Sequence, residues 1–299
     1  MSEIKSPLKP KDGKTLLLDC FNSRQIIEAY KAQGLNVDRF FSKEYIELYK
    51  CVSTGYRFYY PPSIIGDSEF YEELSKTRKN YYSERWEHKK SLSFIGKGDK
   101  VLEIGSGFGI FLQMLKKRQI NAAGIELNMH AVNQCKNINL NVEGNLIEDI
   151  VDDYIEHYDV VCSFQVLEHI YDVHNFIENQ LKILKKGGKL IVGVPNNNPY
   201  LFINDKYHTL NLPPHHAGLW NKDSLFALER VFNLKIEKLI FEPLTLNYDY
   251  FIDFNLNKIR PESVRNILKK QERNYRHIFR SVIPKFINGR NILVVYKKL

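Results

Sequence analysis

The stretch Asp99–Phe111, "DKVLEIGSGFGIF", decides the fold of this chain. Its apolar run contains Glu103 and ends at Ile104, and glycines follow at positions 105, 107 and 109. Glycine lets a backbone approach a ligand closely and adopt turns that other residues avoid. A strand that ends in such a turn and leads into a helix places a ligand at the helix N-terminus. The stretch therefore predicts a strand, a ligand-binding turn and a helix.

The glycine spacing argues against a dinucleotide as the ligand. A dinucleotide fingerprint, G-x-G-x-x-G, would need its third glycine at position 110, which is Ile110. The next apolar segment, "AAGIELN", ends with Glu126, whose carboxylate can accept hydrogen bonds from both hydroxyls of a ribose. Glu103 beside the turn would repel a pyrophosphate and would suit a cationic ligand better. The residues indicate a nucleoside ligand that need not carry phosphate.

From Lys100 onward, short apolar runs alternate with helical patterns. Strands are expected at 100–104, 121–126, 140–143, 157–163 and 188–194, and the runs "LKIEKLIF" and "NILVVYKK" add two more. Alternation of strands and helices predicts a mostly parallel sheet with helices on both faces. The predicted fold class is therefore α/β, with a doubly wound, mostly parallel sheet of about seven strands.

Four segments together resemble one family. "VLEIGSGFG", "GIELN", "YDVVCSFQVLEHI" and "FIENQLKILKKGGKLIVGVPNNNP" occur in the order and at the spacing seen in class I S-adenosylmethionine (SAM) methyltransferases, over about residues 88–240. The resemblance implies a Rossmann-like methyltransferase fold with SAM as methyl donor and S-adenosylhomocysteine as product. The alternative is a related fold that binds NAD or has lost its ligand.

The resemblance also implies a set of cofactor-binding residues. Glu126 would hold the ribose, Leu127 would lie against the adenine with Asn145 as its polar contact, and Gln165 would lie near the methionine part. The cofactor-binding residues implied by these segments are Glu103, Gly105, Ser106, Gly107, Gly109, Glu126, Leu127, Asn145 and Gln165.

The pair Glu168–His169 follows a predicted strand at the sheet edge where ligands bind. Some quinone O-methyltransferases carry Glu-x-x-Glu-His here and use it with a divalent cation, but this sequence has Gln165 in place of the first Glu. Because the substitution removes an anionic ligand, no metal is predicted. The pair is expected to shape the floor of the site, with a direct catalytic role for His169 as the alternative.

The segment "NLPPHHAGLW" contains the second pair of candidate residues, His215 and His216. It resembles a Pro-Pro-His-His element of methyltransferases that act on sugars and related hydroxyl acceptors. A histidine can remove a hydroxyl proton near neutral pH. We expect His216→Ala to lower turnover by ~10²-fold or more if His216 is that base. The alternative is that both histidines only hold the loop or cap the helix expected at 222–231.

Residues 1–80 are predicted to form a separate cap that resembles a degenerate zinc ribbon. Cys20 and Cys51 each stand in a Cys-x-x-Cys-like frame, but Ser23 and Thr54 replace the second cysteines. Hydroxyls are poor zinc ligands, so a ribbon-like fold held by aromatic packing, without zinc, is expected.

Residues 81–299 are predicted to form the SAM-binding domain, which opens with an aromatic segment. Tyr81, Tyr82, Trp86 and His88 precede the first strand, and in this family the preceding helix commonly covers the SAM pocket. Tyr82 and Trp86 are therefore predicted to contact the cofactor, with a cation–π contact to its sulfonium as one possibility. The alternative is ordinary packing of this helix on the sheet.

A basic helical insertion is expected at about 245–290, before the last strand. Residues 258–298 carry twelve Lys or Arg against Glu262 and Glu272, and the whole chain has a net charge of +8. A solvated helix face is the ordinary interpretation. The alternatives are an acceptor that carries phosphate or peripheral contact with an anionic membrane. RNA is not favoured because no RNA-binding module is recognisable, and no DNA partner is expected.

Composition and cysteine usage predict a cytoplasmic protein. No apolar run approaches the roughly 20 residues that span a membrane, the polar beginning gives no signal for secretion, and four scattered cysteines give no disulfide pattern. The Asn-, Ile- and Lys-rich composition suggests a bacterial source.

The combined prediction is a methyltransferase that acts on a hydroxyl of a sugar, nucleotide-sugar or surface-glycan intermediate in polysaccharide biosynthesis, with histidine-assisted deprotonation. The alternative acceptors are a quinone or lipid-like small molecule and RNA. The alternative from another class is a protein that binds SAM without turnover.

Overall fold

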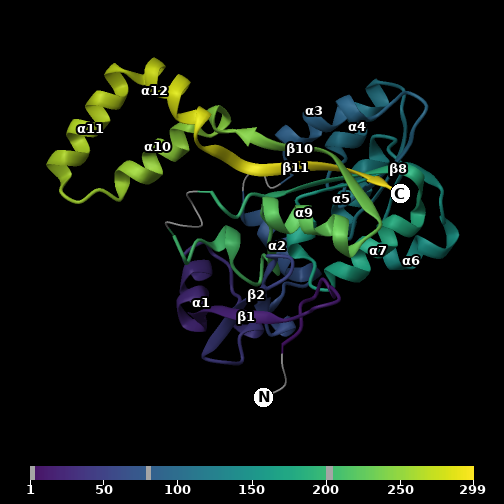
Figure 1. Cartoon of the computed structure of the whole chain (residues 1–299), viewed down its shortest axis with the longest axis horizontal. Helices are drawn as coiled ribbons and strands as arrows, with labels where there is room; N and C mark the ends of the chain where they lie inside the picture. The colour runs from purple at the N-terminus through teal and green to yellow at the C-terminus, as the bar shows by residue number, and fades with distance from the viewer. Residues whose placement is uncertain (1–3, 79–81, 200–204) are drawn as a thin grey trace.

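The computed structural model describes residues 4–78, 82–199 and 205–299. Its centre is a seven-stranded sheet with the strand order β10-β11-β8-β7-β4-β5-β6 (Figure 1). The strands are β4 (Lys100–Ile104), β5 (Asn121–Ile125), β6 (Val142–Glu143), β7 (Tyr158–Phe164), β8 (Leu184–Pro195), β10 (Leu234–Pro243) and β11 (Asn288–Lys298). The predicted α/β class with a mostly parallel sheet of seven strands is confirmed.

The direction of the chain through this sheet reverses beside β4. Strands β4 to β8 run parallel, whereas β11 is antiparallel to both of its neighbours. The chain first adds β5 and β6 on one side of β4 and then adds β7 and β8 on the other side. A crevice opens at the carboxyl ends of the strands at such a switch point, and ligands of open α/β sheets bind there.

Helices cover both faces of the sheet. The neighbours Val101 and Leu102 on β4 point to opposite faces, and each belongs to a different core cluster. Val101 packs with Phe111, whereas Leu102 packs in the cluster that contains Ile177. The helices around this sheet are α3 (Trp86–Ser91), α4 (Ile110–Lys117), α5 (Met129–Asn137), α6 (Ile147–Ile150), α7 (Val173–Ile183) and α9 (Lys222–Val231).

A smaller antiparallel sheet, with the order β1-β2-β3-β9, lies beside the main one (Figure 1). Its first three strands come from the predicted cap, but β9 comes from the segment that follows His216. The elements are β1 (Thr15–Asn22), α1 (Ser23–Lys31), β2 (Tyr45–Cys51), β3 (Arg57–Tyr60), α2 (Ser68–Thr77) and β9 (Gly218–Leu219). The cap is thus joined to the later chain by strand pairing, and a domain boundary at residue 80 stays a prediction.

The resemblance of this segment to a zinc ribbon is not confirmed. In the register of β1 and β2, Cys20 pairs with Glu47 whereas Cys51 pairs with Thr15. The two cysteines therefore lie several residue pairs apart along the ladder, at about 3.4 Å per residue. Ser23 begins α1 instead of closing a metal-binding turn. Aromatic side chains do fill this small core, as in the edge-to-face pair Phe21–Tyr59 with centroids 5.6 Å apart.

The predicted insertion before the last strand consists of three helices. They are α10 (Tyr248–Asn257), α11 (Glu262–Asn274) and α12 (Arg276–Val282), and Figure 1 shows them extending away from both sheets. Within the described ranges, no helix combines the length and the apolar character that crossing a membrane requires.

Candidate active site

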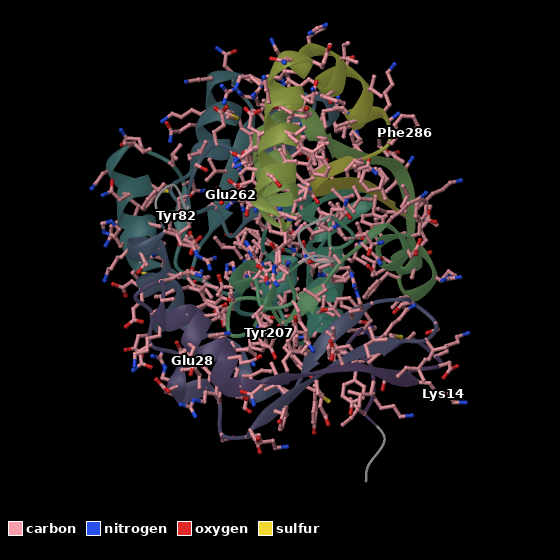
Figure 2. The ribbon with its side chains drawn as sticks, turned by 90° about the vertical axis from the view of Figure 1, so that its left-hand side faces the viewer. Lys14, Glu28, Tyr82, Tyr207, Glu262 and Phe286 are labelled. Carbon is pink, nitrogen blue, oxygen red and sulfur yellow. The ribbon has the colours of Figure 1, made fainter. Side chains whose placement is uncertain are left out.

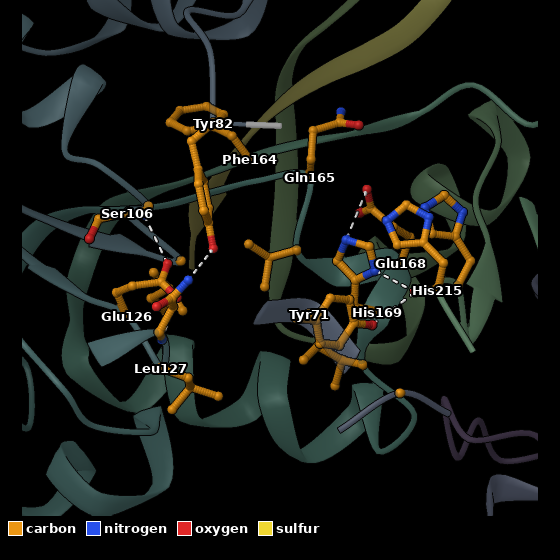
Figure 3. Close-up of a pocket in the computed structure, with 18 of the residues that line it drawn as sticks. Tyr71, Tyr82, Ser106, Glu126, Leu127, Phe164, Gln165, Glu168, His169 and His215 are labelled. Carbon is orange, nitrogen blue, oxygen red and sulfur yellow. Dashed lines mark hydrogen bonds and ion pairs between the residues drawn. The ribbon is translucent and has the colours of Figure 1, made fainter. Parts of the chain in front are cut away.

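A cavity of about 1390 Å³ opens at the carboxyl ends of β4, β5 and β7. Sites for a single small ligand usually enclose roughly 300–1,000 Å³, so this cavity has room for a donor and an acceptor together. Figure 3 shows Glu126 and Tyr82 on one side of it and His169 and His215 on the other. The predicted residues that line it are Tyr82, Glu103, Gly105, Ser106, Gly107, Glu126, Leu127, Asn145, Gln165, His169, His215 and His216.

The glycine turn needs residues without side chains for two separate reasons. Gly105 and Gly107 have φ angles of 73° and 52°, in the left-handed region that L-residues avoid. A Cβ atom on Gly105 would lie 2.5 Å from the side chain of Val166, and one on Gly107 would lie 2.5 Å from the Tyr82 ring. The backbone of the turn therefore lies so close to Val166 and Tyr82 that only glycine fits at these two positions.

Glu126 is held in place by two backbone groups. Its Oε2 accepts from the Gly107 N–H at 2.8 Å, and its Oε1 accepts from the Asn128 N–H at 2.9 Å. Each carboxylate oxygen keeps a further lone pair that can accept from a ribose hydroxyl. Leu127 is exposed toward the cavity beside it, whereas Asn145 donates to the Glu143 carboxylate at 3.1 Å.

The aromatic segment before β4 contributes only part of the predicted lid. Tyr82 lines the cavity, and its hydroxyl accepts from the Asn128 side chain at 3.3 Å. Trp86 is absent from the lining formed by the described residues, because its side chain packs against the core cluster of Val101. Its predicted contact with the cofactor stays a prediction. Tyr81 lies outside the described residues.

Gly109 and Glu103 differ from the expectations in other ways. Gly109 lies just before α4 and faces Leu140, which a Cβ would approach to 2.4 Å, so it shapes the turn without lining the cavity.

Glu103 is buried, and its burial, together with the nearby charge of Glu126, raises its pKa well above the usual range. A cation beside this carboxyl would favour its charged form.

Gln165 is positioned by a residue that the sequence analysis did not identify. Its backbone has a φ of 56°, and its Nε2 donates to Glu87 Oε1 at 2.8 Å and to Asn291 Oδ1 at 3.4 Å. Glu87 lies on α3 and is fully buried, and this burial raises its pKa to about 7. The sequence could not predict this contact, because Glu87 and Gln165 are far apart in the chain and a single Glu in a charged helical segment is not unusual.

Three histidines meet at the other end of the cavity. His169 follows β7, whereas His215 and His216 come from the segment that leads into β9. The ring centroids are 4.8 Å apart for His169–His215, 5.0 Å for His169–His216 and 4.4 Å for His215–His216. Two hydrogen bonds join the segments: the His169 side chain donates from Nδ1 to the His215 carbonyl oxygen at 2.6 Å, and the Ala217 N–H donates to the Glu168 carbonyl.

The His169–His215 contact determines the tautomer of His169. A carbonyl oxygen can only accept, so Nδ1 carries the proton and Nε2 carries the lone pair. Glu168 Oε1 lies 4.0 Å from this Nε2. Burial lowers the pKa of His169 to about 4 and raises that of Glu168 to about 8. Both groups are therefore neutral near pH 7, and His169 presents a nitrogen that can accept a proton.

His215 and His216 are less well suited to accept a proton. Burial lowers the pKa of both well below the usual range, and the other histidines lower it further. The Arg78 guanidinium lies 3.4 Å from His215 Nδ1, and a guanidinium can only donate. Tyr71 donates to the His215 carbonyl at 2.9 Å, so this residue orients its neighbours through its backbone.

The three rings also have the spacing of a metal site. Nitrogen atoms of all three lie within 4.8 Å of one another, close enough for one transition-metal ion to bind all three after a small shift. The Arg78 cation at His215 opposes a second cation at this place. The expectation that no metal takes part stays a prediction.

These features together fit SAM. The left-handed turn brings backbone close to a ligand, Glu126 offers acceptors for a ribose, and the Glu103 carboxyl has a buried Oε2 without a hydrogen-bond partner among the described residues. A buried acid of this kind suits the cationic methionine part. The fold and the site thus define the class as a SAM-dependent methyltransferase.

Comparison with known proteins identifies the family. A family model described as "Methyltransferase domain" matches residues 77–238, more than half of the chain, and the chain belongs to this family. It is a SAM-dependent methyltransferase of that family.

Relatives and solved structures agree with this family. The chain is 28% identical over 214 residues to a "Ubiquinone biosynthesis O-methyltransferase" of Pseudomonas savastanoi pv. phaseolicola, covering 64% of this chain and 87% of the relative. A protein of the same name from Pseudomonas fluorescens Pf0-1 is 27% identical over the same coverage. The PH0226 protein of Pyrococcus horikoshii OT3 shares the fold, with a TM-score of 0.52 at 12% identity over 78% of this chain and 100% of that protein. None of these names refers to a glycan, so the polysaccharide prediction gains no support.

Proposed function

We propose that this enzyme transfers the methyl group to an acidic ring hydroxyl of an apolar, phenol- or quinol-like small molecule. The observation that carries the proposal is the neutral His169, whose ring lines the same cavity as Glu126 and whose proton on Nδ1 leaves the lone pair on Nε2. The relatives named as ubiquinone biosynthesis O-methyltransferases support the same kind of acceptor.

The strength of the base favours a phenol over a sugar. A phenolic hydroxyl has a pKa of about 10, whereas an aliphatic hydroxyl is close to water at about 15.7. Burial lowers the pKa of His169 to about 4, so this imidazole is a weak base. It is better matched to the more acidic hydroxyl. The sugar or glycan acceptor predicted first is therefore the less favoured of the two.

The lining of the acceptor end supports an apolar ring. Tyr71 stacks edge-on against His169 with centroids 5.2 Å apart, and Ile170 and Phe176 also line the cavity. These side chains offer the flat apolar surface that an aromatic acceptor needs.

In the proposed mechanism the protein positions two ligands and removes one proton. SAM, when bound, supplies an electrophilic methyl group on a cationic sulfur. The glycine turn and Glu126 hold the nucleoside, and Gln165 and Glu103 face the methionine part. His169 Nε2 takes the hydroxyl proton, while His215 fixes the ring through its carbonyl. Positioning of this kind can supply a large share of the rate enhancement.

The acceptor is tested with SAM labelled in its methyl group. The protein is incubated separately with a panel of catechols and hydroquinones, with nucleotide sugars and glycans, and with RNA. Label in the phenolic products that is lost in Glu126→Gln supports the proposal. Label that appears only in the sugar fraction or only in RNA would overturn the acceptor class while leaving methyl transfer intact. SAM binding without label in any fraction would indicate a binding protein without turnover.

A further inference from the structure

The three-helix insertion has no core of its own at its outer end. Figure 1 shows α10, α11 and α12 as an arm that leaves the sheets after β10 and returns at β11, and Figure 2 turns the outer end of this arm toward the viewer, with Glu262 and Phe286 labelled. We call residues 248–286 the arm. Neither α11 nor α12 contains a buried residue. Packing within the chain therefore does not explain why these two helices carry apolar side chains.

The arm is strongly basic. It contains nine Lys or Arg against four acidic residues, Asp249, Asp253, Glu262 and Glu272. Three of these acids pair within the arm, Glu262 with Arg265 and both Asp249 and Glu272 with Arg276. Most of the positive charge consequently faces solvent, as at the exposed Lys270 and Arg273.

The arm also exposes an apolar stripe. On α11, Val264, Ile267 and Leu268 recur at the spacing that places residues on one helix face, and all are exposed. On and after α12 the exposed apolar residues are Ile278, Phe279, Val282 and Phe286. Ile267 is 60% and Phe286 is 82% exposed. Helices that lie in a membrane interface typically combine basic and apolar side chains in this way.

We infer that the arm docks the enzyme on an anionic phospholipid surface. Lysine and arginine bind the headgroup phosphates, and the exposed aliphatic and aromatic side chains enter the headgroup boundary. A second copy of the chain is the less suitable partner, because nine cations on each arm would repel one another. RNA would pair with the charge but would leave Ile267 and the other aliphatic side chains in water.

The arm is attached next to the cavity. Asn247, just before α10, and Arg290, at the start of β11, both line the cavity. A docked arm would therefore hold the mouth of the cavity near the bilayer, where an apolar acceptor is concentrated. This consequence rests on the proposed acceptor, whereas the docking itself does not.

Flotation of the whole protein with vesicles tests the inference without any turnover. Binding is expected to vesicles of phosphatidylcholine mixed with phosphatidylglycerol, and not to phosphatidylcholine alone. Lys270→Gln with Arg273→Gln should weaken the partition roughly 25-fold, at about fivefold for each cation removed. The matched control is Lys117→Gln with Lys136→Gln, which removes two exposed charges from α4 and α5 and should change nothing.

A second pair of variants tests the apolar stripe. Ile267→Ser with Phe286→Ser should weaken flotation by about tenfold or more without a change of charge. The control is Ile155→Ser with Leu16→Ser, whose side chains are 61% and 57% exposed elsewhere. No flotation with anionic vesicles would overturn the inference. So would retention on RNA without flotation, or a dimer that the Ile267 and Phe286 changes dissociate. None of these results would bear on methyl transfer to a water-soluble phenol.

Discussion

A single hydrogen bond, from His169 Nδ1 to the His215 carbonyl oxygen at 2.6 Å, selects one histidine of three as the proposed base. The bond places the proton on Nδ1 and the lone pair on Nε2 of a ring that lines the cavity. Sequence spacing could not make this choice, since all three histidines follow predicted strands or stiff loops.

Replacement of His169 is the first residue-scale prediction. His169→Gln should lower kcat by ~10²-fold or more, within the range for a lost general base, while SAM binding is retained. His216→Gln is the matched comparison and should cost much less, since His216 lacks the carbonyl contact. The measurement is steady-state turnover with a phenolic acceptor beside SAM binding by calorimetry. A larger loss at His216 would assign the base to that residue instead.

The same residue makes a pH prediction. Because burial lowers the pKa of His169 to about 4, the ring is already in its neutral, base-competent form at pH 5. The kcat should therefore stay nearly flat between pH 5 and pH 7 instead of rising with the midpoint near 6.5 of an ordinary histidine. A profile of kcat against pH decides between the two, and a clear midpoint near 6.5 would contradict a buried base.

Gly107 carries the second structural prediction at this scale. Gly107→Ala would place a methyl group 2.5 Å from the Tyr82 ring at a φ of 52°. The strain of the left-handed region, about 1–2 kcal/mol, should weaken SAM binding by roughly tenfold or more. Gly98→Ala is the control, since a Cβ at Gly98 meets no atom within 4 Å. Equal SAM affinities of the two variants would show that the turn tolerates a side chain.

At the scale of elements, the segment that contains His215 and His216 lies between β8 and α9. It begins after β8 and ends at α9, whose first turn is capped reciprocally. Asn221 Oδ1 accepts from the Ser224 N–H, and Ser224 Oγ accepts from the Asn221 N–H, both at 2.9 Å. The cap satisfies backbone donors that the helix itself leaves open.

Removal of this cap should destabilise the fold measurably. Asn221→Ala is expected to lower the free energy of unfolding by about 1 kcal/mol, and by up to about 2 kcal/mol because the site is buried. Asn221→Ser keeps a side-chain acceptor and should lose much less. Urea unfolding followed by circular dichroism measures both variants. If Ala and Ser behave alike, the side-chain acceptor is not what stabilises the start of α9.

At the scale of the whole molecule, Trp220 joins the two sheets. It follows β9, is fully buried, and its ring lies 4.4 Å from that of Tyr56 between centroids. Trp220→Ala should cost about 3–5 kcal/mol. The small sheet and the main sheet should still unfold in one transition. Phe226→Ala, at an exposed position of α9, is the control. Two separate transitions in the wild-type protein would favour a cap that folds by itself.

Buried acids should make the stability of the whole molecule fall above neutral pH. Burial raises the pKa of Glu87 to about 7 and that of Glu168 to about 8, whereas an unfolded Glu titrates near 4.3. Such groups stabilise the fold fully below the unfolded pKa, and this contribution is lost as pH rises through the folded pKa. Buried histidines act oppositely below about pH 6.5, so the decline should appear between pH 6.5 and 8. Urea unfolding should show a shallower decline for Glu87→Gln, and an unchanged slope would contradict the assignment.

Much of the cofactor side could be predicted because it is local in sequence. Gly105, Gly107 and Glu126 each follow directly on an apolar run, and parallel strands bring their carboxyl ends to one edge. The partners of these residues were not predictable in the same way. Glu87 and Tyr71 come from segments with little periodicity, and only packing shows that they reach Gln165 and His215.

The sequence by itself determined the α/β sheet, the SAM turn and the helical insertion, because apolar periodicity and glycine spacing act over a few residues. Only the tertiary structure decided how far apart Cys20 and Cys51 lie, that Trp86 packs against the core and that three histidines meet. Each of these depends on register or burial between segments far apart in the chain. Burial also shifts the pKa values of Glu103 and His169, and the spacing of residues in a sequence does not show which side chains are buried.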